Sequence, residues 1–287
     1  MKKAFIFAFL FSSIALSQNN YVKPAKDLKC ILKFSKVEKN DFFNREKIGD
    51  TVWLEINSKK FLGYRTNNKE FFEQIMKPII LEKIEELKKL SSREIINQLT
   101  IFTYLIYQAY FGKSFYRWGG DIFDLDDPQY EGDGYKFKYG LDCSGFTVAG
   151  YEIASYLNLI PGEEIVFSSK GFKSYCKISG FEDTGGILQK SNNYRLDTSE
   201  LDKLGNEIVR LEKNKKISDG EFSLLQAGDI VGRKGHFGIL VESDGKLFYL
   251  ESGGYVVPKM GYDAVEARFA IDKFAESGYV TIRRALK

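Results

Sequence analysis

Residues 235–254 read GHFGILVESDGKLFYLESGG, and they carry a strong local signal for a β-hairpin. Asp244-Gly245 stands between two alternating apolar runs, which is the pattern of two strands joined by a two-residue turn. If these residues form the turn, Ser243 faces Lys246 across the hairpin. Every other cross-strand pair then follows, because the pairing advances by one residue on each strand.

The only histidine of the chain, His236, falls at the start of the first of these strands. The predicted pairing sets His236 opposite Gly253. Because side chains alternate between the two faces of a strand, Glu251 is expected on the same face as His236, at a diagonal position within reach of an imidazole. The alternative interpretation of Glu251 is a strand residue that faces solvent.

A second stretch, GLDCSGFTVAGYEIASYL at 140–157, places a cysteine where a loop turns into an amphipathic helix. Asp142 is a favourable N-cap residue, so Cys143 is expected at the first helical position. Unpaired N–H groups and the positive end of the helix dipole stabilise a thiolate there. Taken alone, Cys143 is better explained as an inert core thiol, and only its partners can favour the reactive interpretation.

Cys143, His236 and Glu251 together supply a nucleophile, a base and a group that orients the base. Acyl-transfer chemistry needs this set of residues. Because the chain has one histidine, only one base of this type is available to the cysteine. These three residues are therefore the candidate catalytic group.

Residues 1–17, MKKAFIFAFLFSSIALS, have the layout of a secretory signal peptide: a basic start, a short apolar middle and small residues before Gln18. A membrane anchor is the alternative, but a span needs about 20 apolar residues. No later segment is apolar enough to cross a bilayer. We therefore expect an exported protein, periplasmic or extracellular and associated with the cell wall, with no stable membrane span after cleavage.

The charge and the cysteine content of the chain bear on its possible partners and on its disulfides. The chain has 42 Lys and Arg against 39 Asp and Glu, and loss of Lys2 and Lys3 with the signal peptide leaves it almost neutral, which gives no argument for nucleic acid. Three cysteines are an odd number for an exported chain, so Cys30 and Cys176 are open to pairing while Cys143 stays a thiol.

The rest of the chain suggests helices followed by strands, which indicates an α+β fold. Residues 18–69 form a small β-rich region with a hairpin in TVWLEIN and KKFLGYRT, residues 70–94 a helical connector, and residues 95–287 the main domain. Pro78 is expected to end or kink a helix, and Ser91 with Glu94 to start the next one. Residues 163–222 are interpreted as polar and irregular.

Metal sites are not predicted. The acidic loop DIFDLDDPQYEGDG lacks the D-x-D-x-D-G spacing of a calcium loop, and one histidine with three scattered cysteines offers no zinc ligand pair. Asp229 in LQAGDIV is interpreted as a structural residue at the start of a strand. No cofactor is expected.

Four motifs occur in order: YRWGG at 116–120, LDCSGF at 141–146, LQAGDIV at 225–231 and GHFGILVE at 235–242. Together they resemble the NlpC/P60 family of cell-wall cysteine peptidases, over about residues 95–287. The resemblance implies a papain-like fold, in which an antiparallel sheet packs against helices, one helix opens with the cysteine and the histidine lies on the adjacent sheet.

The resemblance also implies roles for residues in the matching motifs. It makes Cys143 the nucleophile and His236 the base, and it assigns Tyr116 to the substrate site and the oxyanion region. Trp118, Asp142 and Ser144 stand in the same motifs and are expected beside the substrate. The family's third catalytic residue is His, Asn or Gln, whereas Glu251 is closer to the related CHAP amidases. The segments 121–141 and 162–222 are longer than the family pattern and flank the expected cleft.

The function implied by export and by this resemblance is hydrolysis of amide bonds in peptidoglycan stem peptides, above all between D-glutamate and a diamino acid. Two enzymatic alternatives stay open: a CHAP-like N-acetylmuramoyl-L-alanine amidase, and a secreted effector that attacks another cell's wall. A third alternative is a catalytically silent module that binds the wall or a partner.

Overall fold

The computed structural model describes residues 28–35, 51–56, 59–64, 68–111, 115–116, 120–123, 129–130, 139–161, 189–190, 194–195, 204–233, 235–253 and 264–287. The predicted signal peptide, Trp118 and Cys176 lie outside these residues. The described part is a mixed structure of helices and antiparallel sheet, so the α+β class is confirmed.

A six-stranded antiparallel sheet forms the centre of the molecule, in the order β10-β9-β8-β7-β11-β6. Its strands are β6 (Asn206–Leu211), β7 (Ile230–Arg233), β8 (His236–Ser243), β9 (Lys246–Leu250), β10 (Val265–Glu266) and β11 (Val280–Arg284). Consecutive strands β7, β8 and β9 pair as neighbours, and β11 returns between β7 and β6.

The predicted hairpin is confirmed at residue level. Ser243 pairs with Lys246, and the same pairing continues to Ile239 opposite Leu250. Asp244 and Gly245 both have positive φ, 52° and 71°, the conformation of the two-residue turn that matches the twist of paired strands.

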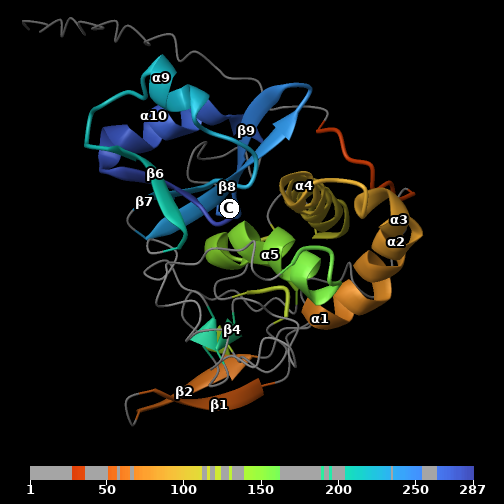
Figure 1. The fold of residues 1–287 in the computed structure, drawn as a ribbon. Coiled ribbons are helices and arrows are strands. Elements are labelled where there is room, and N and C mark those ends of the chain that lie inside the picture. The colour runs from red at the N-terminus through yellow and green to blue at the C-terminus, as the bar shows by residue number, and fades with distance from the viewer. Residues whose placement is uncertain are drawn as a thin grey trace, which may run out of the picture.

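Helices cover both faces of the sheet (Figure 1). The helices α4 (Ser92–Phe111) and α5 (Cys143–Tyr156) pack together against one face, and α10 (Ala267–Ser277) covers the other. Alternation along β8 separates two cores accordingly. Ile239 and Val241 belong to the larger core with α4 and α5, whereas Leu240 belongs to the smaller core with α10.

The helices before α4 join the larger core. They are α1 (Asn68–Phe71), a π-helical turn η2 (Phe72–Met76), α2 (Lys77–Glu82) and α3 (Ile84–Leu87). Pro78 falls in the first turn of α2, directly after the π-helical turn, so it changes the helix type rather than ending the helical segment. A capping box starts α4 as predicted, because Ser91 and Glu94 exchange hydrogen bonds between side chain and backbone.

The β-rich N-terminal region contains the predicted hairpin, formed by β1 (Thr51–Ile56) and β2 (Lys59–Tyr64). A short third strand, β3 (Gln129–Tyr130), pairs with β2. In Figure 1 this small sheet lies at the far end of the molecule from α10. Residues 28–35 instead cross α4, where Leu28, Cys30 and Leu32 enter the larger core.

Part of the segment 163–222 is ordered, contrary to the sequence prediction. Residues 206–211 form β6, whose partner β11 lies about 70 residues further along the chain. A short helix, α9 (Asp219–Ser223), follows, and two residue pairs form β4 (Gln189–Lys190) and β5 (Tyr194–Arg195). Sequence analysis did not identify β6, because the strand that supplies its hydrogen bonds, β11, is distant in the sequence.

Asp229 is structural, as predicted. Its buried carboxylate accepts two hydrogen bonds from the Arg284 guanidinium at 2.8 Å and one from the Gln226 N–H at 2.9 Å, which joins the start of β7 to the end of β11. Burial raises the pKa of Asp229 even though Arg284 opposes that change.

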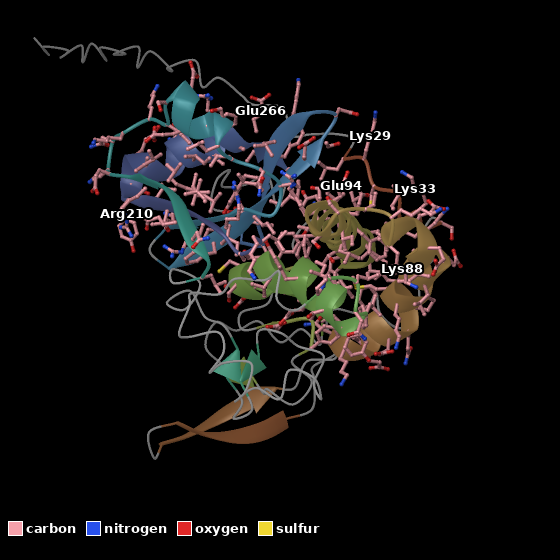
Figure 2. The ribbon with its side chains drawn as sticks, in the orientation of Figure 1. Lys29, Lys33, Lys88, Glu94, Arg210 and Glu266 are labelled. Carbon is pink, nitrogen blue, oxygen red and sulfur yellow. The ribbon has the colours of Figure 1, made fainter. Side chains whose placement is uncertain are left out.

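Charged side chains lie mainly outside both cores. Lys33, Lys88 and Arg210 lie at the outer edges of the molecule in Figure 2, and they come from three separate parts of the chain. Among the described helices, none combines the length and the apolar character that a membrane crossing requires.

Candidate active site

The cysteine of the LDCSGF motif opens α5, as predicted. Asp142 has extended backbone angles and acts as the N-cap, with its Oδ1 accepting hydrogen bonds from the Gly145 N–H at 2.9 Å and the Ser144 hydroxyl at 2.8 Å. Cys143 is therefore the first helical residue, with 8 % of its surface exposed. The Cys143 carbonyl accepts a hydrogen bond from the Thr147 hydroxyl at 2.7 Å.

The glycine two residues after Cys143 is required by close packing. A Cβ at Gly145 would collide with the carbonyl oxygen of Gly120, which already accepts a hydrogen bond from the Asp142 N–H at 3.0 Å. The end of the YRWGG motif therefore lies directly against the start of α5. The parallel bridge between Tyr116 and Leu141 extends this contact.

A buried asparagine holds these segments together. The Asn68 side chain donates to the carbonyls of Asp121 and Gly140, both at 2.7 Å, and it accepts from the Gly140 N–H at 3.0 Å and the Tyr107 hydroxyl at 3.2 Å. Sequence reasoning did not identify Asn68, because a single polar residue at the start of a helix gives no sign that its partners lie 53 and 72 residues away.

The predicted contact between the histidine and the carboxylate of the hairpin is present. His236 Nε2 lies 2.5 Å from Glu251 Oε2, with both side chains buried. The alternative in which Glu251 faces solvent is therefore wrong, since Glu251 is 5 % exposed. Because Nε2 faces the carboxylate, proton exchange with a group other than Glu251 would go through Nδ1.

Tyr249 is a further member of this cluster. Its hydroxyl donates to the same Glu251 Oε2 at 3.0 Å. Burial, together with the Glu251 carboxylate and the nearby Cys143, raises the pKa of Tyr249 well above its ordinary value, so the hydroxyl keeps its proton. Strand alternation could have identified Tyr249, because a residue two positions before Glu251 lies on the same face of the strand.

The end of β9 is tied to the residues that precede Cys143. The Ser252 hydroxyl donates to the Leu141 carbonyl at 2.6 Å, one residue beyond Glu251 on one side and two residues before Cys143 on the other. In addition, Cys143 is close enough to Tyr249 for a thiolate there to contribute to the raised pKa of the tyrosine. The helix start and the His236–Glu251 pair therefore belong to one region.

The remaining predicted residues have different positions. Asp142 caps α5, the Ser144 hydroxyl donates to the Asp142 carboxylate, and Tyr116 is half-buried against the larger core. Their contact with a substrate stays a prediction, and Trp118 lies outside the described residues. Cys30 is a free thiol, and Cys176, the partner that the sequence left open for it, lies outside the described residues.

The described residues contain no group of three His, Cys, Asp or Glu side chains placed to hold a metal ion. Chemically, the region combines a thiol at a helix N-terminus, an imidazole and a carboxylate. No protein-family model, curated protein or solved structure matches the chain.

Proposed function

We propose that this chain is an exported cysteine hydrolase of the NlpC/P60 type, with a papain-like arrangement, that cleaves amide bonds in peptidoglycan stem peptides. The observation that carries the proposal is the buried hydrogen bond between the only histidine and Glu251, next to the helix start that presents Cys143. A bond between D-glutamate and a diamino acid is the preferred target.

The first half of the reaction forms a thioester. His236 Nδ1 accepts the thiol proton, and the Cys143 sulfur attacks the amide carbonyl carbon. The imidazolium then gives the proton to the leaving nitrogen as the carbon–nitrogen bond breaks. Glu251 holds the imidazole through Nε2 and stabilises its charged form. The proposal thus requires Cys143 Sγ to come within hydrogen-bond reach of Nδ1.

The developing oxyanion needs donors at the helix start. The Cys143 N–H is suited to this role because the first N–H groups of a helix have no partner within the helix. Tyr116 is the second proposed donor, through its hydroxyl. Water then attacks the thioester, His236 accepts the water proton, and release of the carboxylic acid restores the thiol. No cofactor takes part.

A second candidate is a CHAP-like amidase that cuts between muramic acid and L-alanine. The observation that favours it is the identity of Glu251, a carboxylate where NlpC/P60 enzymes have His, Asn or Gln. The two candidates share the mechanism and differ in the bond. Only the masses of the products separate them.

The test is an incubation of the chain from Gln18 with intact peptidoglycan and defined muropeptides, read by mass spectrometry. Cys143→Ala is the inactive variant, and Cys30→Ala is the matched control because it removes an equally buried thiol elsewhere. New peptide ends that need Cys143 but not Cys30 support the hydrolase, and a free muramoyl lactyl group indicates the amidase. If walls of several chemotypes are not cleaved under reducing conditions, both enzymatic candidates are contradicted. The catalytically silent binding module then becomes the preferred interpretation.

A further inference from the structure

We propose that Tyr249 is a positioning residue that holds the Glu251 carboxylate against His236 and thereby sets the pH at which Cys143 becomes a nucleophile. This inference rests on the proposed function, since it concerns how the same cysteine and histidine are made reactive. Tyr249 acts through Glu251 and does not touch the substrate.

The geometry centres on a single oxygen. Glu251 Oε2 lies 2.5 Å from His236 Nε2 and accepts from the Tyr249 hydroxyl at 3.0 Å. Two donors on one carboxylate oxygen restrict rotation of the carboxylate, so the oxygen that meets the imidazole is held in place. The tyrosine side chain is itself fully buried, which restricts its own rotation.

The position of the hydroxyl is built into the packing. The Tyr249 ring packs edge-to-face on Phe274 of α10, with centroids 5.2 Å apart, and the opposite side of its tip fills the space above Gly238. A Cβ at Gly238 would collide with the Tyr249 Cζ and Oη. The second glycine of the GHFG sequence is therefore needed to let the hydroxyl reach Glu251.

The surrounding charges determine what the hydroxyl does. The groups that act on Tyr249 are Glu251 at the end of β9, Cys143 of α5 and Arg233 of β7, whereas α10 presents Phe274. Burial is the main cause of the raised pKa of Tyr249, Glu251 and Cys143 add to it, and only Arg233 opposes it. The hydroxyl is therefore a permanent donor, and its hydrogen bond favours the ionised form of Glu251 over the protonated form.

An ionised Glu251 leaves the shared proton on His236. If the Tyr249 hydroxyl is removed, Glu251 competes for that proton, and formation of the thiolate–imidazolium pair requires a higher pH. Hydrogen bonds to charged groups are stronger than those between neutral groups. Loss of the one from Tyr249 is expected to raise the pH at which the pair forms by about one unit. Below the pH of this shifted transition, Cys143 of a variant without the hydroxyl is expected to react about tenfold more slowly than Cys143 of the wild type.

The experiment measures the rate at which iodoacetamide alkylates Cys143 between pH 4 and pH 10, read on the Cys143 peptide by mass spectrometry. It needs no substrate. Tyr249→Phe removes one hydroxyl and keeps the ring. Tyr151→Phe is the matched control, because Tyr151 is equally buried and donates its hydroxyl to a different acceptor, the Gly228 carbonyl, at 2.7 Å.

We expect the acid limb of the alkylation profile to move up in Tyr249→Phe and to stay in place in Tyr151→Phe. Gly238→Ala, which displaces the hydroxyl without deleting it, is expected to move the limb in the same direction. In a Glu251→Ala background, Tyr249→Phe is expected to add nothing. An equal shift in both Phe variants indicates loosened packing and overturns the inference.

The outcomes distinguish this inference from the proposed function. If the acid limb of the wild-type alkylation profile lies well below the ordinary thiol pKa of about 8.5 and does not move in Tyr249→Phe, the role of Tyr249 is overturned. The proposed cysteine–histidine pair is then retained. A wild-type Cys143 that titrates as an ordinary thiol contradicts the proposed function itself, and the inference falls with it.

Discussion

Two buried thiols of this chain lie in opposite surroundings. Cys30 and Cys143 are 5 % and 8 % exposed. Cys30 lies in the extended segment that crosses α4, where its Sγ donates to the Gln98 carbonyl at 3.4 Å, and burial raises its pKa to about 11. Cys143 lies at a helix N-terminus, and the Ser252–Leu141 hydrogen bond and its effect on Tyr249 place it in the same region as His236 and Glu251.

Burial therefore does not by itself determine whether a cysteine is reactive. Burial in apolar surroundings favours the neutral thiol, whereas unpaired N–H groups and a nearby imidazolium favour the thiolate. For Cys30, burial is the dominant influence, and a backbone hydrogen bond at Leu32 and the charge of Lys33 oppose it only in part. The following predictions test this contrast, from the largest expected effect to the smallest.

The rate of alkylation is expected to differ most. At pH 7 we expect iodoacetamide to modify Cys143 at least roughly 10³-fold faster than Cys30, because a thiol of pKa about 11 is almost entirely protonated there. Peptide mapping by mass spectrometry measures both rates in one sample. In denaturant the two rates are expected to converge, and equal rates in the folded protein would contradict the contrast.

The carboxylate behind His236 is expected to have the next largest effect. Glu251→Ala removes the acceptor and should lower the rate of hydrolysis about a hundredfold, whereas Glu251→Gln keeps a neutral acceptor and should lower it about tenfold. Glu242→Gln is the control, because Glu242 is exposed on the same hairpin. Steady-state rates against pH check this order, and a fully active Glu251→Ala would remove Glu251 from the mechanism.

Cys30 is expected to affect stability at high pH. Its folded pKa is raised from about 9 to about 11, so its contribution to stability is complete below pH 9 and is lost as the pH rises towards 11. The free energy of unfolding of the wild type should therefore fall by about 2 kcal/mol more than that of Cys30→Ala over this interval. Urea unfolding at pH 8, 9.5 and 11 measures it, and parallel curves would contradict the raised pKa.

The cap of α5 is expected to have the smallest effect. Asp142→Ala removes the acceptor of two hydrogen bonds and should cost about 1 kcal/mol of stability, while Asp142→Asn should cost less. Chemical denaturation checks this, with Ser218→Ala at the exposed cap of α9 as the comparison. Alkylation of Cys143 should change in Asp142→Ala while that of Cys30 does not, because the cap lies next to only one of the two thiols.

Elements with local causes were predicted well. The Asp244-Gly245 turn defines the pairing of β8 and β9 within a few residues, and strand alternation then puts Glu251 on the face of His236. Likewise Asp142 and the Ser91–Glu94 capping box mark the starts of α5 and α4 by contacts within three residues. In each case the partners are close in sequence, so their geometry follows from backbone regularity.

Features with distant partners could not be predicted. The segment that forms β6 looks irregular until β11 supplies its hydrogen bonds, and Asn68 looks like an ordinary polar residue until the backbone of residues 121 and 140 surrounds it. Tyr249 is intermediate, since its face was predictable but the hydrogen bond to Glu251 was not.

By itself, the sequence determined which residues are available for chemistry: one histidine, a cysteine behind an N-cap aspartate, and a glutamate two strand positions from the pairing partner of the histidine. Tertiary structure alone decided that Ser252 binds the Leu141 carbonyl, that Gly145 admits the Gly120 carbonyl, and that Tyr249 shares the Glu251 oxygen. The physical reason is that these contacts join segments many residues apart, and only packing of the two cores brings them together.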